Sequence, residues 1–317
     1  MKRVWIPVVV LLALGTLTGP AAASFPGGNG TIVYGWLGEA TYRAGPVATS
    51  IRAVDSSNGL VRVLRDCPLQ YGGAPTHADC IVGAPRASPD GTRVAFATIQ
   101  VVVRPPDPWE YRPGLGLMAS GGTGLEEHHG QHSYGSLAWS PAGDRLLLSR
   151  QLGPGGSNES GIYLASLDGT ELDQVTPEGT GSPDWSSTGR IAFVRRSNIW
   201  LTRLGGTPRR LTRRGGYSPS WSPRGSKLAF VRWVGGRGEI FLVGRDGDGL
   251  RRLTHRGGSS PSWSPDGRWI AFIRAGDLFV VRTNGRGLRR LVDGLREPEF
   301  GEGPQVTAVD WQALPRR

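Results

Sequence analysis

Five side chains of the kinds that bind metal ions, two glutamates and three histidines, lie within one short segment, residues 124–135, which reads GLEEHHGQHSYG. Imidazole nitrogens and carboxylate oxygens are usual ligands of zinc, so Glu127, His128, His129 and His132 are candidate metal ligands. No helical pattern sets their geometry and no second cluster supports them, so a solvated polar loop is the alternative. We predict no bound metal or other cofactor, with these four residues as the candidates if one binds.

A second segment has the composition of a binding surface. Residues 104–114 read RPPDPWEYRPG and place Trp109, Tyr111 and Arg112 between prolines that stiffen the chain. Trp, Tyr and Arg are enriched at the hot spots of protein interfaces. The alternative is that the two rings pack across their own loop. We predict that these three residues, together with His128, His129 and His132, form a binding surface.

Motifs for nucleophilic catalysis and calcium binding do not fit the chain. The string closest to a Gly-x-Ser-x-Gly nucleophile elbow is GQHSYG at 130–135, and its spacing is wrong. The aspartates of GRDGDGLRR, residues 244–252, lack the later oxygen ligands of a calcium loop and indicate a hairpin turn. We therefore predict no catalytic residue and a protein that is not an enzyme.

An internal repeat supplies the elements that must position these side chains. The stretch SPSWSPRGSKLAFVR at 218–232 returns as SPSWSPDGRWIAFIR at 260–274. Within each unit, β-branched and aromatic runs alternate with Gly, Pro and Asn turns, which is typical of four antiparallel strands. Tandem units of this kind predict an all-β, six-bladed β-propeller. The six anchor positions of the repeat are Ala87, Trp139, Trp185, Trp221, Trp263 and Trp311.

The two ends of the repeat region are complementary. The segment GNGTIVY (28–34) enters at a second strand, whereas VTAVDW (306–311) is a first strand without a second. Paired, they would complete one blade and close the ring, which removes two open sheet edges. The bulky anchors Trp139, Trp185, Trp221, Trp263 and Trp311 are predicted to be structural, filling space between wedge-shaped blades. Asp184 and Asp310, each directly before an anchor, would approach the central channel, where a lyase or glycosidase would place its carboxylates.

The N-terminus has the pattern of a cleavable export signal. Lys2 and Arg3 precede a short apolar run, and small residues follow at Ala21 and Ala23. We predict a signal peptide at 1–23 and a single β-propeller domain at 24–317, without a membrane-spanning segment in the mature chain. An even pair of cysteines in an exported chain favours a disulfide, so Cys67 and Cys80 are predicted to be bonded rather than free or metal-bound.

Charge divides the chain into two halves. Residues 24–189 carry 10 Arg against 16 acids, a balance of −6, whereas residues 190–296 carry 22 Arg and one Lys against 6 acids, a balance of +17. Such asymmetry can indicate an anionic partner for residues 190–296. The alternative is a solvated face in a chain that uses Arg in place of Lys, since only two Lys occur.

The repeat resembles a known family. WSPDGRWIAF (263–272) followed by DLFVVRTNGRGLRRLV (277–292) resembles the TolB-type β-propeller repeat of exported bacterial envelope proteins, and FPGGNGTIVY (25–34) resembles the start of many of them. The resemblance covers most of 24–317 and implies a fold rather than a function. TolB carries an additional α/β domain before its propeller, whereas here the propeller begins at the predicted cleavage site, so the Tol–Pal role is not carried over.

Loop lengths indicate which side of the ring binds a partner. The long connections are expected to lie on one face, mostly in the first three units, and elaborated loops on a rigid scaffold usually carry function. We predict a monomeric, periplasmic or extracellular, non-catalytic scaffold that binds an envelope protein or polymer. An envelope hydrolase or lyase with a loop-face metal or carboxylate site is the alternative. The expected long connections are residues 36–48, 65–84, 99–113, 121–135, 151–160 and 293–305.

Overall fold

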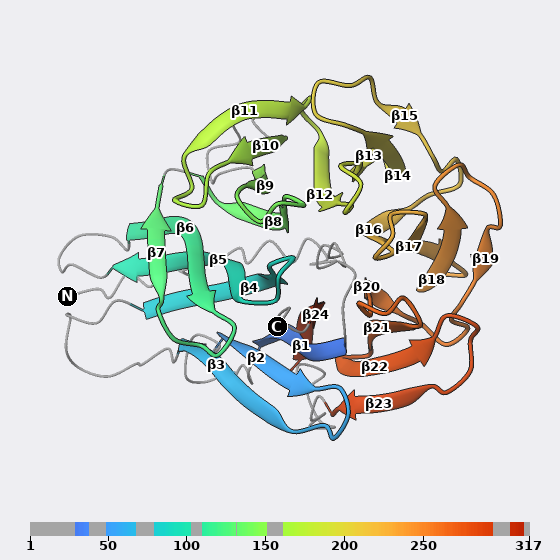
Figure 1. Cartoon of the computed structure of the whole chain (residues 1–317), viewed down its shortest axis with the longest axis horizontal. Helices are drawn as coiled ribbons and strands as arrows, with labels where there is room; N and C mark the ends of the chain where they lie inside the picture. The colour runs from blue at the N-terminus through green and yellow to red at the C-terminus, as the bar shows by residue number, and fades with distance from the viewer. Residues whose placement is uncertain are drawn as a thin grey trace, which may run out of the picture.

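The computed structural model describes residues 29–37, 49–67, 79–102, 110–130, 132–150, 161–293 and 305–313. This part of the chain forms 24 strands in six four-stranded antiparallel sheets, which are arranged as blades around a central axis (Figure 1). The predicted six-bladed all-β propeller is thereby confirmed. Within these ranges no helix has the length and apolar character needed to cross a membrane. The predicted signal peptide, residues 1–23, lies outside the described residues.

Each blade runs from an inner strand at the axis to an outer strand at the rim. Blade 1 contains β24 (Gln305–Ala313), β1 (Asn29–Leu37), β2 (Thr49–Asp55) and β3 (Val61–Cys67). Blade 2 contains β4 (Asp79–Ala87), β5 (Arg93–Val102), β6 (Glu110–Ala119) and β7 (Glu126–His129). Blade 3 contains β8 (Tyr134–Trp139), β9 (Leu146–Arg150), β10 (Ile162–Ala165) and β11 (Glu171–Thr176).

The outer strands of blades 4 and 5 are only two residues long, and that of blade 6 has four residues. Blade 4 contains β12 (Thr180–Trp185), β13 (Ile191–Arg195), β14 (Asn198–Thr202) and β15 (Arg209–Arg210). Blade 5 contains β16 (Tyr217–Trp221), β17 (Lys227–Val234), β18 (Arg237–Gly244) and β19 (Arg251–Arg252). Blade 6 contains β20 (Ser259–Trp263), β21 (Trp269–Arg274), β22 (Asp277–Arg282) and β23 (Arg289–Val292).

The repeated Ser-Pro-x-Gly stretch after the anchor forms the turn between the first two strands of a blade. In blade 6 the Ser264 hydroxyl donates to the Asp266 carboxylate at 2.6 Å and accepts from the Trp269 amide at 2.9 Å. Gly267 closes the turn with φ of 73°, a conformation that glycine adopts without a steric cost. The five anchor tryptophans are 0–4 % exposed. The motif therefore builds the frame of each blade.

The Ser-Pro pair before the anchor forms a bulge in the inner strand. Ser182, Ser218 and Ser260, three residues before their anchors, have φ of 51°, 46° and 47°, and Ala84 has φ of 50° at the equivalent position of blade 2. Each is followed by a proline, which has no backbone N–H to donate. An inner edge strand accepts proline because no neighbouring strand lies on that side to receive the hydrogen bond. A bulge redirects the side chain that follows it. Here that side chain is the residue directly before the anchor.

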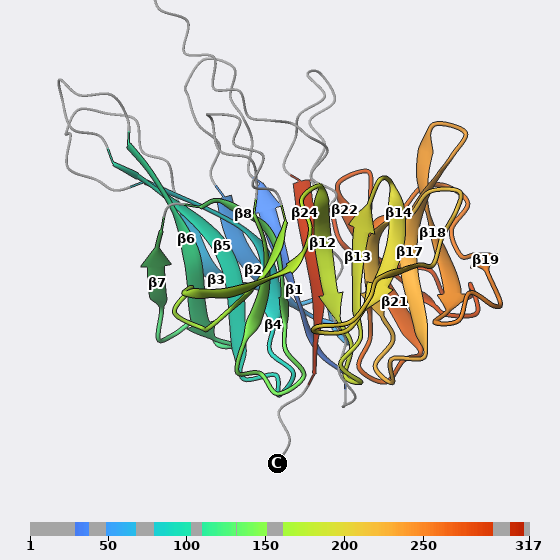
Figure 2. The same ribbon diagram turned by 90° about the horizontal axis from the view of Figure 1, so that it is seen from above.

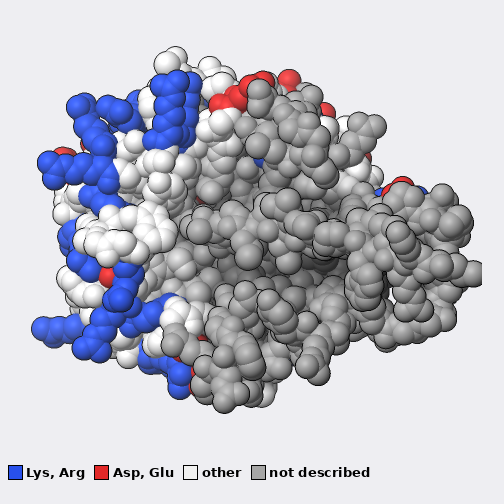
Figure 3. Space-filling view, turned by 180° about the vertical axis from the view of Figure 1, so that it is seen from behind, with Lys and Arg blue, Asp and Glu red and all other residues white. Residues whose placement is uncertain are grey.

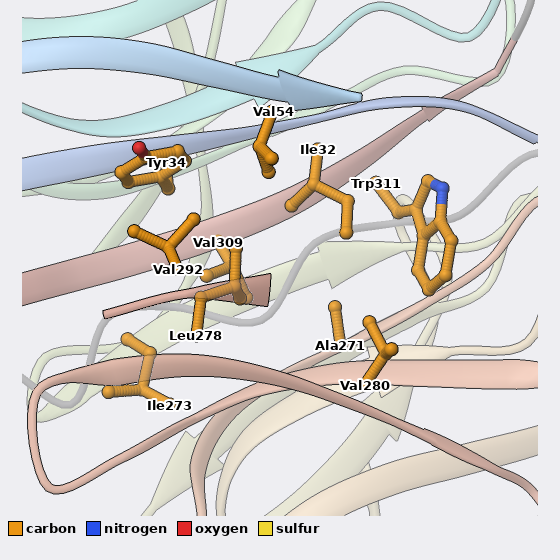
Figure 4. Close-up of a cluster of buried hydrophobic side chains, with 10 residues drawn as sticks. All are labelled: Ile32, Tyr34, Val54, Ala271, Ile273, Leu278, Val280, Val292, Val309 and Trp311. Atoms are coloured by element: carbon orange, nitrogen blue, oxygen red, sulfur yellow. The ribbon is translucent and has the colours of Figure 1, made fainter. Parts of the chain in front are cut away.

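The C-terminal strand closes the ring as predicted. Strand β24 pairs antiparallel with β1, with Ile32 opposite Trp311 and Val33 opposite Asp310. Figure 4 shows that side chains from both ends of the chain meet those of blade 6 in one apolar cluster. In that cluster Val309 and Trp311 are at most 4 % exposed and lie with Leu278 and Val280. Closure thus buries apolar side chains in addition to pairing two strands.

Arginines at the rim connect blades 4, 5, 6 and 1. The first residue of each outer strand in blades 4–6 is an arginine whose guanidinium donates to a backbone carbonyl at the end of the third strand of the next blade. Arg209 reaches the Arg245 carbonyl at 2.5 Å, Arg251 reaches the Thr283 carbonyl, and Arg289 reaches the Ser56 carbonyl at 2.6 Å. Part of the basic charge of residues 190–296 therefore holds the ring together.

The predicted disulfide would join the end of β3 to the start of β4. Cys67 ends β3 opposite Thr49, and the Thr49 hydroxyl accepts from the amide of Val82, two residues after Cys80. Cys67 is buried, and no described cysteine is a free thiol. The side chain of Cys80 lies outside the described residues, so the Cys67–Cys80 bond stays a prediction.

We expect the exported protein to show no thiol available for labelling after denaturation without reductant, and a mass lower by two hydrogen atoms than the reduced chain. Since closing a loop of this length stabilises a chain by about 3 kcal/mol, reductant should lower the melting temperature of the parent. The Cys67→Ser/Cys80→Ser variant should melt at the same temperature with and without reductant. Labelling of both cysteines in the oxidised protein would contradict the assignment.

Candidate functional site

The two faces of the ring differ in their connections. Each internal segment outside the described residues connects a second strand to a third or a fourth strand to the next blade. The strand ends that these segments join lie on one face of the ring, here called the loop face (Figure 2). This agrees with the face predicted from loop lengths. One range requires correction: residues 121–135 are not a single loop, because the outer strand β7 occupies Glu126–His129 and separates two short connections.

The opposite face, here called the turn face, consists of short turns that contact the next blade. The Arg93 guanidinium donates to the Gly143 carbonyl at 2.8 Å, and the Ser187 hydroxyl donates to the Pro223 carbonyl at 2.7 Å. Between blades 6 and 1, the Asn29 side chain donates to the Asp266 carboxylate at 3.0 Å. Because these turns belong to the contacts between blades, longer insertions are confined to the loop face.

Three of the four candidate metal ligands, Glu127, His128 and His129, lie on the outer strand β7, and His132 follows it. Along β7, neighbouring side chains point to opposite sides, so Glu127 and His129 share one side and His128 lies on the other. The Glu127 carboxylate lies 3.4 Å from the Arg65 guanidinium and 3.9 Å from Nε2 of His129. Nδ1 of His129 lies 3.2 Å from the Arg112 carbonyl oxygen. Within the described ranges no group of three potential ligands lies together.

The aromatic segment is divided between described and undescribed residues. Strands β5 and β6 extend their ladder to the pair Val102–Glu110, so that Tyr111 and Arg112 lie in a strand rather than in a loop. The Arg112 guanidinium binds the Glu110 carboxylate at 2.9 and 3.1 Å, and both side chains are exposed. Trp109 and the side chain of Tyr111 lie outside the described residues, so their binding role stays a prediction.

The two candidate carboxylates are buried in contacts between blades. Asp310 accepts from the amide of Ala87 in blade 2 at 2.7 Å, and Asp184 accepts from the amide of Trp221 in blade 5 at 2.5 Å. Asp184 is 0 % and Asp310 1 % exposed. A carboxylate without exposed surface cannot contact a substrate, so this structure does not offer the two aspartates as the open carboxylate pair that a lyase or glycosidase would use.

Sequence reasoning missed the arginine that accompanies them. Arg86 occupies the same position before anchor Ala87, is 1 % exposed, and donates through Nε to the Leu137 carbonyl of blade 3 at 3.0 Å. In blade 6 the equivalent Ser262 hydroxyl accepts from the Trp311 amide at 3.0 Å. We call these residues, Arg86, Asp184, Ser262 and Asp310, the central belt. The position directly before the anchor could have indicated Arg86 as well. Its anchor is Ala87 rather than a tryptophan, which made that position less conspicuous.

Burial sets the protonation of the central belt. It raises the pKa of Asp310 to about 6, against the opposing effects of the Arg86 charge and the Ala87 amide. It also raises the pKa of Asp184 well above its usual value, and the negative charge of Asp310 adds to that rise. Oδ1 of Asp184 is buried and has no hydrogen-bond partner in the described part of the chain. Within the central belt, burial therefore favours the protonated forms of Asp184 and Asp310.

Several known proteins resemble this chain in part of the sequence or in the fold. No family model matches the chain. The Protein TolB homolog of Chlorobium luteolum is 35 % identical over 114 residues, which span 33 % of this chain and 25 % of that relative. The crystal structure of TolB from Acinetobacter baumannii superposes with a TM-score of 0.65 at 18 % identity, covering 90 % of this chain and 67 % of that one.

A puromycin-hydrolyzing peptidase of Mycobacterium tuberculosis also superposes, with a TM-score of 0.55 at 19 % identity, covering 84 % of this chain and 46 % of the peptidase. At these identities the structural likenesses concern the fold alone. Together with the partial match to the Protein TolB homolog, they support a TolB-like β-propeller fold for this chain.

Asp310 should make stability depend on pH. An acid whose pKa is about 6 when folded, against 3.8 unfolded, contributes stability below pH 4 that is lost as the pH rises to 6. Chemical denaturation should give the free energy of unfolding of the parent and of Asp310→Asn at each pH. Between pH 4 and 7 the parent should lose on the order of 2–3 kcal/mol relative to the variant. Comparing pH slopes removes the constant effect of the substitution. A difference that is independent of pH would show that Asp310 titrates normally.

Proposed function

We propose that the protein is a non-catalytic binding scaffold of the bacterial cell envelope, which holds a protein or polymer partner on the loop face of blades 1–3. The observation that carries the proposal is the difference between the two faces. Short turns bonded to the next blade make up the turn face, whereas the connections that depart from the repeat open on the loop face. A rigid ring with variable connections on one side is the usual arrangement of a recognition module.

The export pattern of residues 1–23 and the likeness to TolB support a location in the periplasm or outside the cell. We propose that the protein acts there as a monomer. Strands β5 and β6 extend to the pair Val102–Glu110 on the loop-face side of blade 2, and Tyr111 and Arg112 belong to that extension. An ordered two-stranded extension loses little conformational entropy on binding, so we propose that this end of the hairpin, together with Trp109, is the centre of the partner surface.

The alternative function is an envelope hydrolase or lyase with a metal at the loop-face end of β7. The observation that favours it is the arrangement of Glu127 and His129 on the same side of that strand, with their side chains 3.9 Å apart. A third ligand would have to come from a residue such as His132, which follows the strand. The arrangement supplies at most an incomplete zinc site, and we therefore propose the scaffold role.

Capture from an envelope extract tests the scaffold role. We expect the tagged propeller to retain a discrete partner, and the Trp109→Ala/Tyr111→Ala variant to lose it, because hot-spot aromatic residues carry a large share of binding energy. The matched control is Leu250→Ala/Leu288→Ala, which removes two half-exposed apolar side chains from the turn face. A partner retained equally by both variants, or lost equally by both, would contradict the proposed surface.

Thermal melting with added metal tests the alternative. We expect zinc, manganese and calcium to leave the melting temperature unchanged, because the described ligands form no complete site. His128 points to the other side of β7 and provides the control. A zinc-dependent rise that disappears in His129→Ala/His132→Ala but survives in His128→Ala would overturn the expectation and establish a metal site.

A further inference from the structure

Blade 5 carries an extended hairpin on the loop face that its neighbours lack. In blades 4 and 6 the ladder between the second and third strands ends at Arg195–Asn198 and Arg274–Asp277. The equivalent pair in blade 5 is Arg232–Glu239, and the ladder continues through two more pairs, Trp233–Gly238 and Val234–Arg237. Figure 2 shows the β17–β18 hairpin rising beyond the corresponding turns of blades 4 and 6.

The two added pairs place apolar side chains in solvent. Trp233 is 50 % exposed and Val234 37 % exposed, although both stand next to a glycine-rich tip that would allow a tighter turn. The blade thus leaves half of Trp233 and more than a third of Val234 uncovered on a hairpin extension that blades 4 and 6 lack. Their exposure therefore indicates a surface that they contact in a bound state.

Behind the tip lie two pairs of arginines that repeat with the blades. The Arg232 guanidinium rests on Phe230 and Phe241, with Cζ 5.3 and 5.0 Å from the ring centroids, and donates to the Gly215 carbonyl at 3.3 Å. Burial and then the charge of Arg214 lower the pKa of Arg232, so the two cations are neighbours. Arg232 is thus fixed in position, and Arg214 is exposed beside it.

The second pair repeats this arrangement one blade further on. Arg274 rests on Phe272 and Phe279, with Cζ 5.1 Å from each ring centroid, and donates to the Gly257 carbonyl at 3.0 Å. Burial lowers the pKa of Arg274, the negative charge of Glu239 opposes that shift, and the neighbouring charge of Arg256 lowers the pKa further. Arg256, like Arg214, is exposed.

The loops that carry Arg214 and Arg256 are held by buried polar groups. Glu239, 1 % exposed, accepts from the Thr254 hydroxyl at 2.6 Å and from the Gly257 amide at 3.0 Å. The equivalent Asn198 accepts from the Gly215 amide at 3.2 Å. These contacts fix the two loops before any ligand binds, so the arginine pairs require little ordering on binding.

The acids of this region are already engaged. Glu239 binds Arg252 at 2.9 Å and Asp277 binds Arg290 at 3.4 Å. Among the described residues, the four arginines of the two pairs have no carboxylate within ion-pairing distance. Figure 3, which views the loop face, shows Lys and Arg side chains gathered on the side of blades 4–6. The surface is therefore complementary to anions.

We propose that the loop face of blades 4–6 docks onto the surface of an anionic lipid membrane, with the two arginine pairs binding lipid phosphates and Trp233 and Val234 entering the interface between headgroups and acyl chains. Arginine binds phosphate through two parallel hydrogen bonds, and tryptophan prefers the membrane interface. An acidic peptide or soluble polyanion would use the arginine pairs alone and would leave the extended apolar tip without a role. The site lies over other blades than the partner surface proposed above and does not depend on it.

Co-sedimentation with vesicles tests the proposal. The protein is residues 24–317, because all six sheets are complete within residues 29–313, and the vesicles are phosphatidylcholine with or without phosphatidylglycerol. We expect binding only to the anionic vesicles, weakened about tenfold or more by Arg214→Ala/Arg256→Ala and falling with added salt. The charge-matched control, Arg224→Ala/Arg286→Ala, removes two exposed cations from the turn face and should bind like the parent.

A second arm tests the tip. Residues 233–238 are replaced by Ala-Gly, the connection that blade 6 uses at 275–276, and Trp233→Ser/Val234→Ser is made in parallel. Both should weaken vesicle binding several-fold while leaving the melting temperature unchanged. The proposal is overturned if the parent does not bind anionic vesicles, if the control variant loses binding equally, or if the tip variants bind like the parent. Retention by polyglutamate with no effect of the tip would instead indicate an acidic protein partner.

Discussion

Contacts between neighbouring blades hold this ring together. The contacts of the central belt bury charged side chains and therefore require well-placed hydrogen-bond partners. A propeller blade is a wedge whose apolar faces pack without strong directional preference, so hydrogen bonds must fix how one blade sits against the next. Arg86, Asp184 and Asp310 do this by binding the backbone of the following blade. Removing charges from water is costly, and here the cost is offset by backbone dipoles and by the mutual attraction of opposite charges. The bulge before each anchor places the side chains where they can make these bonds.

The need for contacts between blades also explains why the two faces of the ring differ in shape. Turn-face residues such as Arg93 and Ser187 bind the next blade, and the rim arginines Arg209, Arg251 and Arg289 bind the ends of third strands near that face. Lengthening a turn there would displace a bond between blades. On the loop face the chain extends a ladder in β5–β6 and in β17–β18, and all six sheets keep their four strands. Recognition surfaces therefore belong on the loop face.

The repeat allowed the fold, the number of blades and the closing strand to be predicted, because each unit carries its own turn and anchor signals. The candidate site was less predictable. Residues 126–129 are an outer strand with polar side chains on both sides, so they show no alternation and resembled a loop. Asp184 and Asp310 lie on inner strands near the axis, as predicted, but their burial depends on contacts with the next blade. The contacting residue lies 37 positions away in the sequence for Asp184 and 223 positions away for Asp310. The local sequence around each aspartate does not reveal these contacts.

The basic half of the chain shows why composition alone does not decide between a structural and a functional role for arginine. Arg209, Arg251 and Arg289 bridge blades, and Arg252 and Arg290 neutralise acids at the start of the third strands. These arginines would be required in a propeller without any anionic partner. Arg214 and Arg256 differ, since they stand exposed beside a second cation on loops that are already ordered. Placing like charges together raises the free energy of the unbound protein, and an anion at that position removes the repulsion. The repeated pairing of cations, more than the net charge, is the feature that indicates binding.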